Sequence, residues 1–161
     1  MKLFKKKVDI QLDSHQITSL GTGEVIDIQK VSDPVFAAES MGPSVAFISD
    51  KNTLVSPIDG EICMLFPTQH AIGIKSETGI EILIHIGINT VELNGMGFKT
   101  FVSQGQHVKR GDRLIKIDFR YLKEQGYDGT VMLILTNTNQ KKVIKHNGKC
   151  TPSDIIMTLS E

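Results

Sequence analysis

The chain has 161 residues, 40% of them apolar and 22% charged, a composition typical of one soluble globular domain with a buried core. Lysine and arginine total 18, as do aspartate and glutamate, so the formal charge is zero and no basic field indicates a nucleic-acid partner. The apolar runs are too short to cross a bilayer and no signal peptide is visible, so we expect a cytoplasmic protein.

Residues 1–20 are expected to form a flexible tail ahead of a single domain over residues 21–161. The segment from Met1 to Lys7 places Leu3 and Phe4 among lysines, a pattern that could make weak contact with anionic lipid. A solvated tail explains the same composition and is favoured over membrane contact.

From Gly23 onward, short segments rich in β-branched residues alternate with turn-forming residues. The expected strands are residues 24–28, 44–48, 60–65, 71–74, 81–86, 114–118, 131–135 and 142–144. Two short helices are expected, over residues 34–41 with Asp33 as N-cap and over residues 120–125. This spacing predicts an all-β sandwich or barrel rather than alternating strands and helices.

One of the five histidines, His85, lies in an almost wholly apolar predicted strand. Strict alternation places His85 on one face with Leu83 and Gly87, and isoleucines on the other face. A reactive imidazole beside a glycine suits a nucleophile that a large partner must approach. On the pattern alone, a buried histidine bonded to a backbone carbonyl is a slightly better explanation.

A second histidine, His70, begins another predicted strand, two residues after Thr68. Residues two apart in an extended chain share a face, so both side chains could point at one site. The 15-residue separation from His85 fits two antiparallel strands joined through Thr78 and Gly79. A histidine at the end of a loop, with no such role, remains the alternative.

Two facing imidazoles would suit the transfer of a phosphoryl group. One imidazole is nucleophilic at its unprotonated nitrogen, and the other, with Thr68, can supply hydrogen-bond donors to phosphoryl oxygens. The chain has neither a phosphate-binding loop of the G-x-x-x-x-G-K-[ST] kind nor a kinase signature, so the phosphoryl donor should be another protein rather than ATP.

Around these histidines the chain resembles the glucose-type enzyme IIA of the bacterial phosphoenolpyruvate-dependent sugar phosphotransferase system. The resembling segments are residues 33–37, 56–60, 66–74, 79–98, 108–112 and 133–137. The resemblance implies an antiparallel β-sandwich of the barrel-sandwich-hybrid type, and it implies no cofactor. It also implies a phosphocarrier that takes a phosphoryl group from the phosphocarrier HPr and gives it to a cysteine of an enzyme IIB domain of a sugar transporter. Regulatory protein targets are implied as well.

The resemblance also implies roles for individual residues. His85 corresponds to the histidine that is phosphorylated at Nε2, and His70 corresponds to its partner, which stabilises the phosphoryl group. The backbone carbonyl of Gly87 would hold Nδ1 of His85, and Thr68 would support His70 through a hydrogen bond.

Four apolar residues near these motifs are expected to dock partner proteins: Phe36, Phe66, Ile72 and Val91. Each of them is individually better explained as a core residue, and Val91, which follows the His85 strand, is the strongest candidate for a true contact. The chain departs from the family's usual pattern at Gly42-Pro43-Ser44 and at Asn89, where an aspartate is common. Loss of that negative charge could alter which donor or regulator docks.

Two other functions fit less well. A zinc enzyme could share the sandwich topology, but catalytic zinc requires three protein ligands and no third ligand beside His70 and His85 is evident. Adventitious zinc bridging these two histidines is a separate and more plausible event. A regulatory module that no longer transfers phosphate would not need both histidines and Thr68.

Overall fold

The computed structural model describes residues 12–161, which form strands linked by turns and four short helical segments. The strands are β1 (Gln16–Thr18), β2 (Gly23–Ile26), β3 (Ser44–Ser49), β4 (Thr53–Val55), β5 (Gly60–Leu65), β6 (Ala71–Lys75), β7 (Glu81–Ile86), β8 (Phe98–Thr100), β9 (His107–Val108), β10 (Arg113–Ile117), β11 (Val131–Asn137), β12 (Lys142–Lys145), β13 (Gly148–Cys150) and β14 (Ile155–Ser160). The helical segments are η1 (Ile28–Lys30), α1 (Pro34–Ala37), η2 (Thr90–Leu93) and α2 (Phe119–Glu124).

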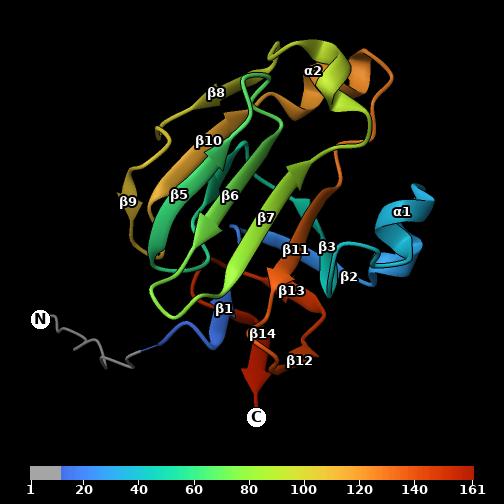
Figure 1. Cartoon of the computed structure of the whole chain (residues 1–161). Helices are drawn as coiled ribbons and strands as arrows, with labels where there is room; N and C mark the ends of the chain where they lie inside the picture. Colours follow the sequence, from blue (N-terminus) through green and yellow to red (C-terminus); the bar gives the residue numbers. More distant parts are fainter. Residues whose placement is uncertain (1–11) are drawn as a thin grey trace, which may run out of the picture.

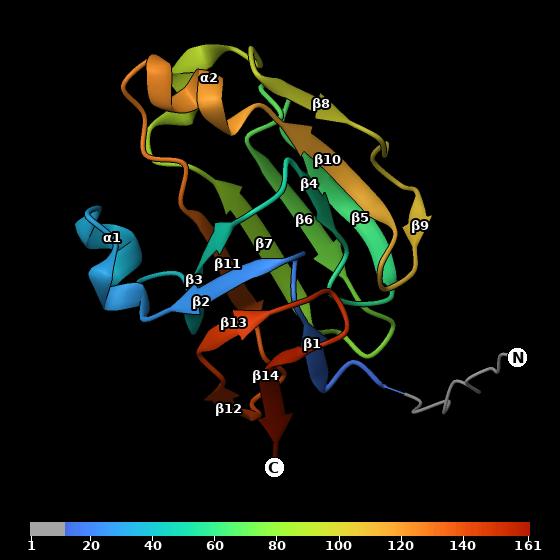
Figure 2. The same ribbon diagram turned by 180° about the vertical axis from the view of Figure 1, so that it is seen from behind.

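The strands form antiparallel sheets, which confirms the predicted β-sandwich. One sheet has the order β13-β2-β3-β11-β7-β6-β5-β9, a second has the order β4-β10-β8, and a third has the order β1-β14-β12. In Figures 1 and 2 the β4-β10-β8 sheet forms a layer across β5, β6 and β7. The helix α2 lies at one end of this sandwich, and α1 lies beside β2 and β3 (Figure 1).

The main core lies between these layers and follows from the period-two alternation of the strands. Along β7, Ile82, Ile84 and Ile86 are at most 1% exposed, whereas Leu83 and His85 on the opposite face are half-buried. The buried isoleucines meet residues of β4 and β10 in one apolar cluster. The opposite face of β7 is covered only in part, by a smaller cluster that includes Phe36 and Leu83.

All eight expected strands are present, within three residues of their predicted ends. The sequence prediction missed β1, β4, β8, β9, β13 and β14. Of the two expected helices, α2 lies one residue earlier than predicted, and α1 ends at Ala37 rather than at residue 41. Glu39 ends the helical path because it adopts a left-handed conformation with φ 56°, and its carboxylate accepts from the backbone N–H of Ser44.

The expected tail over residues 1–20 is too long. Residues 16–18 form β1 and pair with β14, and Ile17 and Leu20 are completely buried in the main core. This segment belongs to the sandwich because its apolar side chains close one end of the core. The expected lipid contact of residues 1–7 lies outside the described residues.

None of the helices over residues 12–161 has the length and apolar character needed to cross a membrane.

Candidate functional site

His70 and His85 lie side by side at one end of β6 and β7. Ala71 pairs with His85 in the antiparallel register, and the backbone N–H of Ile86 donates to the carbonyl of His70 at 2.8 Å. The two imidazole rings meet edge to face, with centroids 5.1 Å apart and planes at 82°. The hairpin through Thr78 and Gly79 therefore brings both histidines to one place, as their spacing indicated.

The ring of His85 has a defined orientation. Its Nδ1 lies 2.9 Å from the backbone carbonyl of Gly87. A carbonyl oxygen only accepts hydrogen bonds, so Nδ1 carries the proton, and in the neutral ring Nε2 keeps its lone pair. The geometry therefore makes Nε2 the nucleophilic atom of this side chain.

The surroundings of His85 favour its neutral form. Burial lowers the pKa of His85 from 6.5 to about 4, and the neighbouring His70 acts in the same direction. The hydrogen bond to Gly87 and the carboxylate of Asp33 oppose this effect without cancelling it. At neutral pH the imidazole is thus neutral, with its Nε2 lone pair able to act as a nucleophile.

His70 has 5% of its surface exposed, and burial lowers its pKa as well. The hydroxyl of Thr68 lies 2.6 Å from Nδ1 of His70, so both side chains do point at one site. When Thr68 donates to Nδ1, the proton of the neutral ring sits on Nε2, where it can be donated to an anion.

Aromatic rings flank the pair on both sides. The ring of Phe36 lies 4.7 Å from that of His85, and the ring of Phe66 lies 5.2 Å from that of His70. Val91 is 47% exposed and Phe66 is 36% exposed, as a docking surface requires. Ile72 is 0% exposed, so the expectation that it docks partners is wrong, because its side chain faces the main core.

Asp33 has a small electrostatic effect on His85 that the sequence prediction missed. It was expected only as a helix cap, and its side chain does accept from the backbone N–H of Val35 at 2.8 Å. The same carboxylate also raises the pKa of His85. Asn89 is exposed and left-handed at φ 62°, and its side chain makes no capping hydrogen bond. The carboxylate that affects the pKa of His85 is that of Asp33, and its effect is smaller than those of burial, His70 and Gly87.

Within residues 12–161, no three side chains of histidine, cysteine, aspartate or glutamate lie close enough together to hold a metal ion. His70 and His85 alone are one protein ligand short of a catalytic zinc site.

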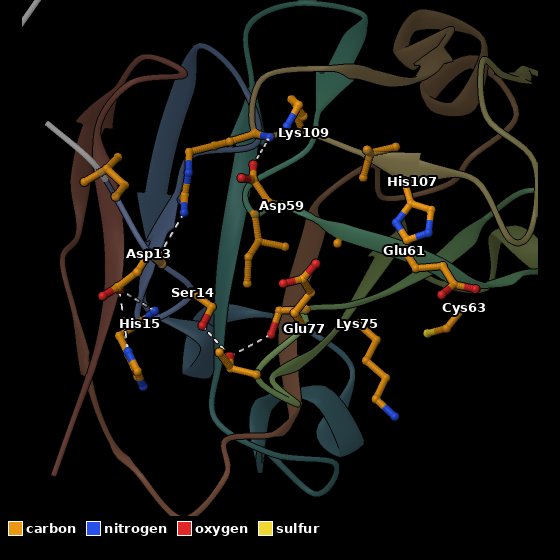
Figure 3. Close-up of a pocket in the computed structure, with 17 residues that line it drawn as sticks. Asp13, Ser14, His15, Asp59, Glu61, Cys63, Lys75, Glu77, His107 and Lys109 are labelled. Atoms are coloured by element: carbon orange, nitrogen blue, oxygen red, sulfur yellow. Dashed lines mark hydrogen bonds and ion pairs between the residues drawn. The ribbon is translucent and has the colours of Figure 1, made fainter. Parts of the chain in front are cut away.

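A cavity of about 870 Å³ lies elsewhere, against β5, β6 and β9 (Figure 3). Asp13 and His15 line one side of it, and Glu61, Cys63 and His107 line another. Neither His70 nor His85 lines this cavity. The two paired histidines lie instead beside exposed apolar side chains, an arrangement that suits a protein partner better than a small molecule.

Comparison with known proteins gives the family. The family model for the phosphoenolpyruvate-dependent sugar phosphotransferase system, EIIA 1, matches residues 15–141. The chain belongs to this family, and it is therefore a phosphotransferase component with a phosphocarrier role in sugar transport.

Individual relatives agree with this assignment. Glucose-specific EIIA components of Bacillus cereus and Bacillus anthracis are each 43% identical over 145 residues, covering 89% of this chain and 88% of theirs. The solved structure of the glucose permease IIA from Mycoplasma capricolum superposes with a TM-score of 0.85 at 32% identity, and the match covers 98% of both chains.

Proposed function

We propose that this protein carries a phosphoryl group on Nε2 of His85. The donor would be phosphorylated HPr, and the acceptor would be a cysteine of an enzyme IIB domain. The observation that carries the proposal is the hydrogen bond from Nδ1 of His85 to the carbonyl of Gly87, because it leaves the Nε2 lone pair free.

Two displacements at phosphorus make up the relay. The Nε2 lone pair attacks the phosphoryl group, and the nitrogen–phosphorus bond of the donor breaks with its electron pair returning to the donor histidine. A cysteine thiolate of the second partner then attacks the phosphorus, and His85 recovers its lone pair. No oxidant, metal or nucleotide is needed, and each step conserves atoms and charge.

His70 would stabilise the phosphoryl group during transfer. With Thr68 bonded to its Nδ1, the Nε2 proton of His70 can be donated to a phosphoryl oxygen. Donors placed in advance stabilise the charge of the transferring group, which is the main source of catalysis in phosphoryl transfer.

The exposed apolar residues would serve docking. Phe66 is exposed beside His70, and Phe36 lies against the His85 ring. Val91 is exposed on η2, which follows the His85 strand. Their burial by a partner would exclude water from the reacting atoms and limit hydrolysis.

The proposed setting is the cytoplasm, on the inner side of a sugar transporter. The Bacillus relatives carry glucose-specific names, so a glucose transporter is the first acceptor to test. The transporter rather than this protein would select the sugar.

The test incubates the protein with phosphoenolpyruvate, enzyme I and HPr, and then measures its intact mass under alkaline conditions. We expect one acid-labile phosphoryl group, absent in His85→Gln and retained in His107→Gln, a control at an exposed histidine on β9. His70→Gln should accept or pass on the group about a hundredfold more slowly. If phosphorylated HPr transfers nothing to the wild-type protein, the chain is instead a regulatory binding module.

A further inference from the structure

The carbonyl that orients His85 belongs to Gly87, the most easily rotated residue of the turn after β7. Gly87 has φ 80°, in the left-handed region that glycine enters freely. Rotation of the peptide planes on either side of it would carry the Gly87 carbonyl away from Nδ1 of His85. The position of that carbonyl therefore needs an explanation from the surrounding structure.

Two neighbouring backbone groups fix part of the turn. The N–H of Gly87 donates to the carbonyl of Thr130, and the N–H of Ile88 donates to the carbonyl of Asp128, both at 2.9 Å. These bonds hold one end of each peptide plane that flanks Gly87. The opposite end of the second plane is the Gly87 carbonyl itself, which accepts from His85.

The remaining end, the carbonyl of Ile86, is held by a side chain. The hydroxyl of Thr90 reaches back across the turn and donates to it. Thr90 is 0% exposed, and its methyl group lies against Gly87, 2.5 Å from where a Cβ on that residue would stand. Of these four hydrogen bonds, two have backbone N–H donors and one has His85 as donor. Only the bond from the Thr90 hydroxyl can therefore be removed by a substitution that leaves His85 and the backbone unchanged.

We propose that Thr90 is a positioning residue whose hydroxyl, through the Ile86 carbonyl, locks the turn at Gly87 so that the Gly87 carbonyl keeps the proton of His85 on Nδ1. The proposal rests on the proposed function of His85, because the consequence of the lock is a free lone pair at Nε2. Without the Thr90 hydroxyl, the His85 ring could carry its proton on Nε2 instead of Nδ1, and in that tautomer Nε2 cannot attack phosphorus.

A matched set of variants separates the hydroxyl from the methyl group. Thr90→Val keeps the shape and removes the donor, whereas Thr90→Ser keeps the donor and removes the methyl. The ¹⁵N chemical shifts of His85 in the unphosphorylated protein report which ring nitrogen carries the proton. Single-turnover transfer from phosphorylated HPr reports the reactivity of the same ring.

We expect Thr90→Val to raise the fraction of His85 protonated at Nε2 and to slow transfer about tenfold, the rate equivalent of one hydrogen bond. Thr90→Ser should retain the wild-type tautomer and rate. If Thr90→Val does not fold, Thr90→Ala takes its place in the comparison with Thr90→Ser.

Two results would overturn the proposal. One is a wild-type tautomer in the variant that lacks the hydroxyl, and the other is an equal loss of rate in Thr90→Ser, which would assign the effect to packing. Because the tautomer is read without any phosphoryl group, it tests Thr90 even if wild-type His85 accepts nothing. That failure would count against the proposed function alone.

Discussion

At the scale of single residues, His85 combines two properties that usually conflict. It is buried enough to remain neutral at physiological pH, with a pKa lowered to about 4, yet it is only half-buried and its neighbour His70 lies against the exposed ring of Phe66. Its Nδ1 proton is donated to the backbone carbonyl of Gly87, so Nε2 is the one reactive nitrogen of the ring.

The lowered pKa predicts how stability depends on pH. Unfolded His85 binds a proton near pH 6.5, whereas the folded residue does so only near pH 4. Between these values the unfolded chain binds more protons, so the free energy of unfolding should fall as pH drops from 6.5 to 4, by about 3 kcal/mol from this residue.

Denaturant unfolding of the wild-type protein and of His85→Gln at pH 7 and pH 4 measures this effect. The variant should lose less stability over that interval. Parallel losses in both proteins would show that His85 titrates normally.

The part of the site that could be predicted from the sequence consists of residues that are two positions apart in the chain. Thr68 and His70 do interact as predicted, although Gln69 between them is left-handed at φ 61° rather than extended. The Gly87 carbonyl as the partner of His85 was indicated by the family resemblance rather than by the strand pattern. Ile72 was misassigned because a strand buried on both faces shows no alternation that separates surface from core. The effect of Asp33 on His85 depends on the tertiary structure, because the two residues are far apart in the sequence, and no local pattern indicates it.

At the scale of elements, the turn between β7 and η2 determines where the Gly87 carbonyl points. A Cβ on Gly87 would meet Cγ2 of Thr90 at 2.5 Å and the carbonyl oxygen of Asp128 at 3.0 Å. The turn therefore has room for glycine only, for reasons of space as well as of backbone angle.

Gly87→Ala tests this turn. We expect it to lower the free energy of unfolding by about 2–4 kcal/mol, the sum of left-handed strain and steric overlap. Gly79→Ala is the matched control, because Gly79 also has a positive φ, at 94°, but nothing lies within 4 Å of its Cβ position. Chemical denaturation of both variants measures the difference, and equal losses would contradict the steric argument.

Strand length explains which elements the sequence revealed. The predicted strands carry runs of β-branched residues, whereas β9 has two residues and β1, β4, β8 and β13 have three each, too few to show a period. The six-residue β14 (Ile155–Ser160) is long enough to show an apolar pattern, but the sequence prediction missed it. The third sheet, which contains β1, β12 and β14, was consequently not predicted.

At the scale of the whole molecule, hydrogen bonds from Arg110 connect the first described segment, from Asp13 to β1, to the rest of the sandwich. Its guanidinium donates to the backbone carbonyls of Gln16 at 2.6 Å, Pro57 at 2.8 Å and Asp13 at 2.9 Å. These bonds hold β1 in place, and with it the buried Ile17 that closes one end of the core.

Arg110→Met should therefore destabilise the protein by about 2–3 kcal/mol, because it leaves backbone carbonyls without a charged donor. Phosphoryl acceptance by the folded variant should not change, since Arg110 lines the separate cavity, to which neither His70 nor His85 contributes. Arg120→Met removes an exposed arginine that pairs with Glu124 and serves as the control, with no measurable loss expected. Thermal unfolding compares the two, and similar losses would count against the role of Arg110.

The central claim is that the fold leaves Nε2 of His85 as the one nucleophilic atom of the pair. The most direct measurement is ³¹P and ¹⁵N NMR of the histidine-labelled protein after phosphorylation by HPr. The predicted result is a phosphoryl group on Nε2 of His85, with the proton retained on Nδ1. A phosphoryl group on Nδ1 of His85, or on His70, would contradict the claim.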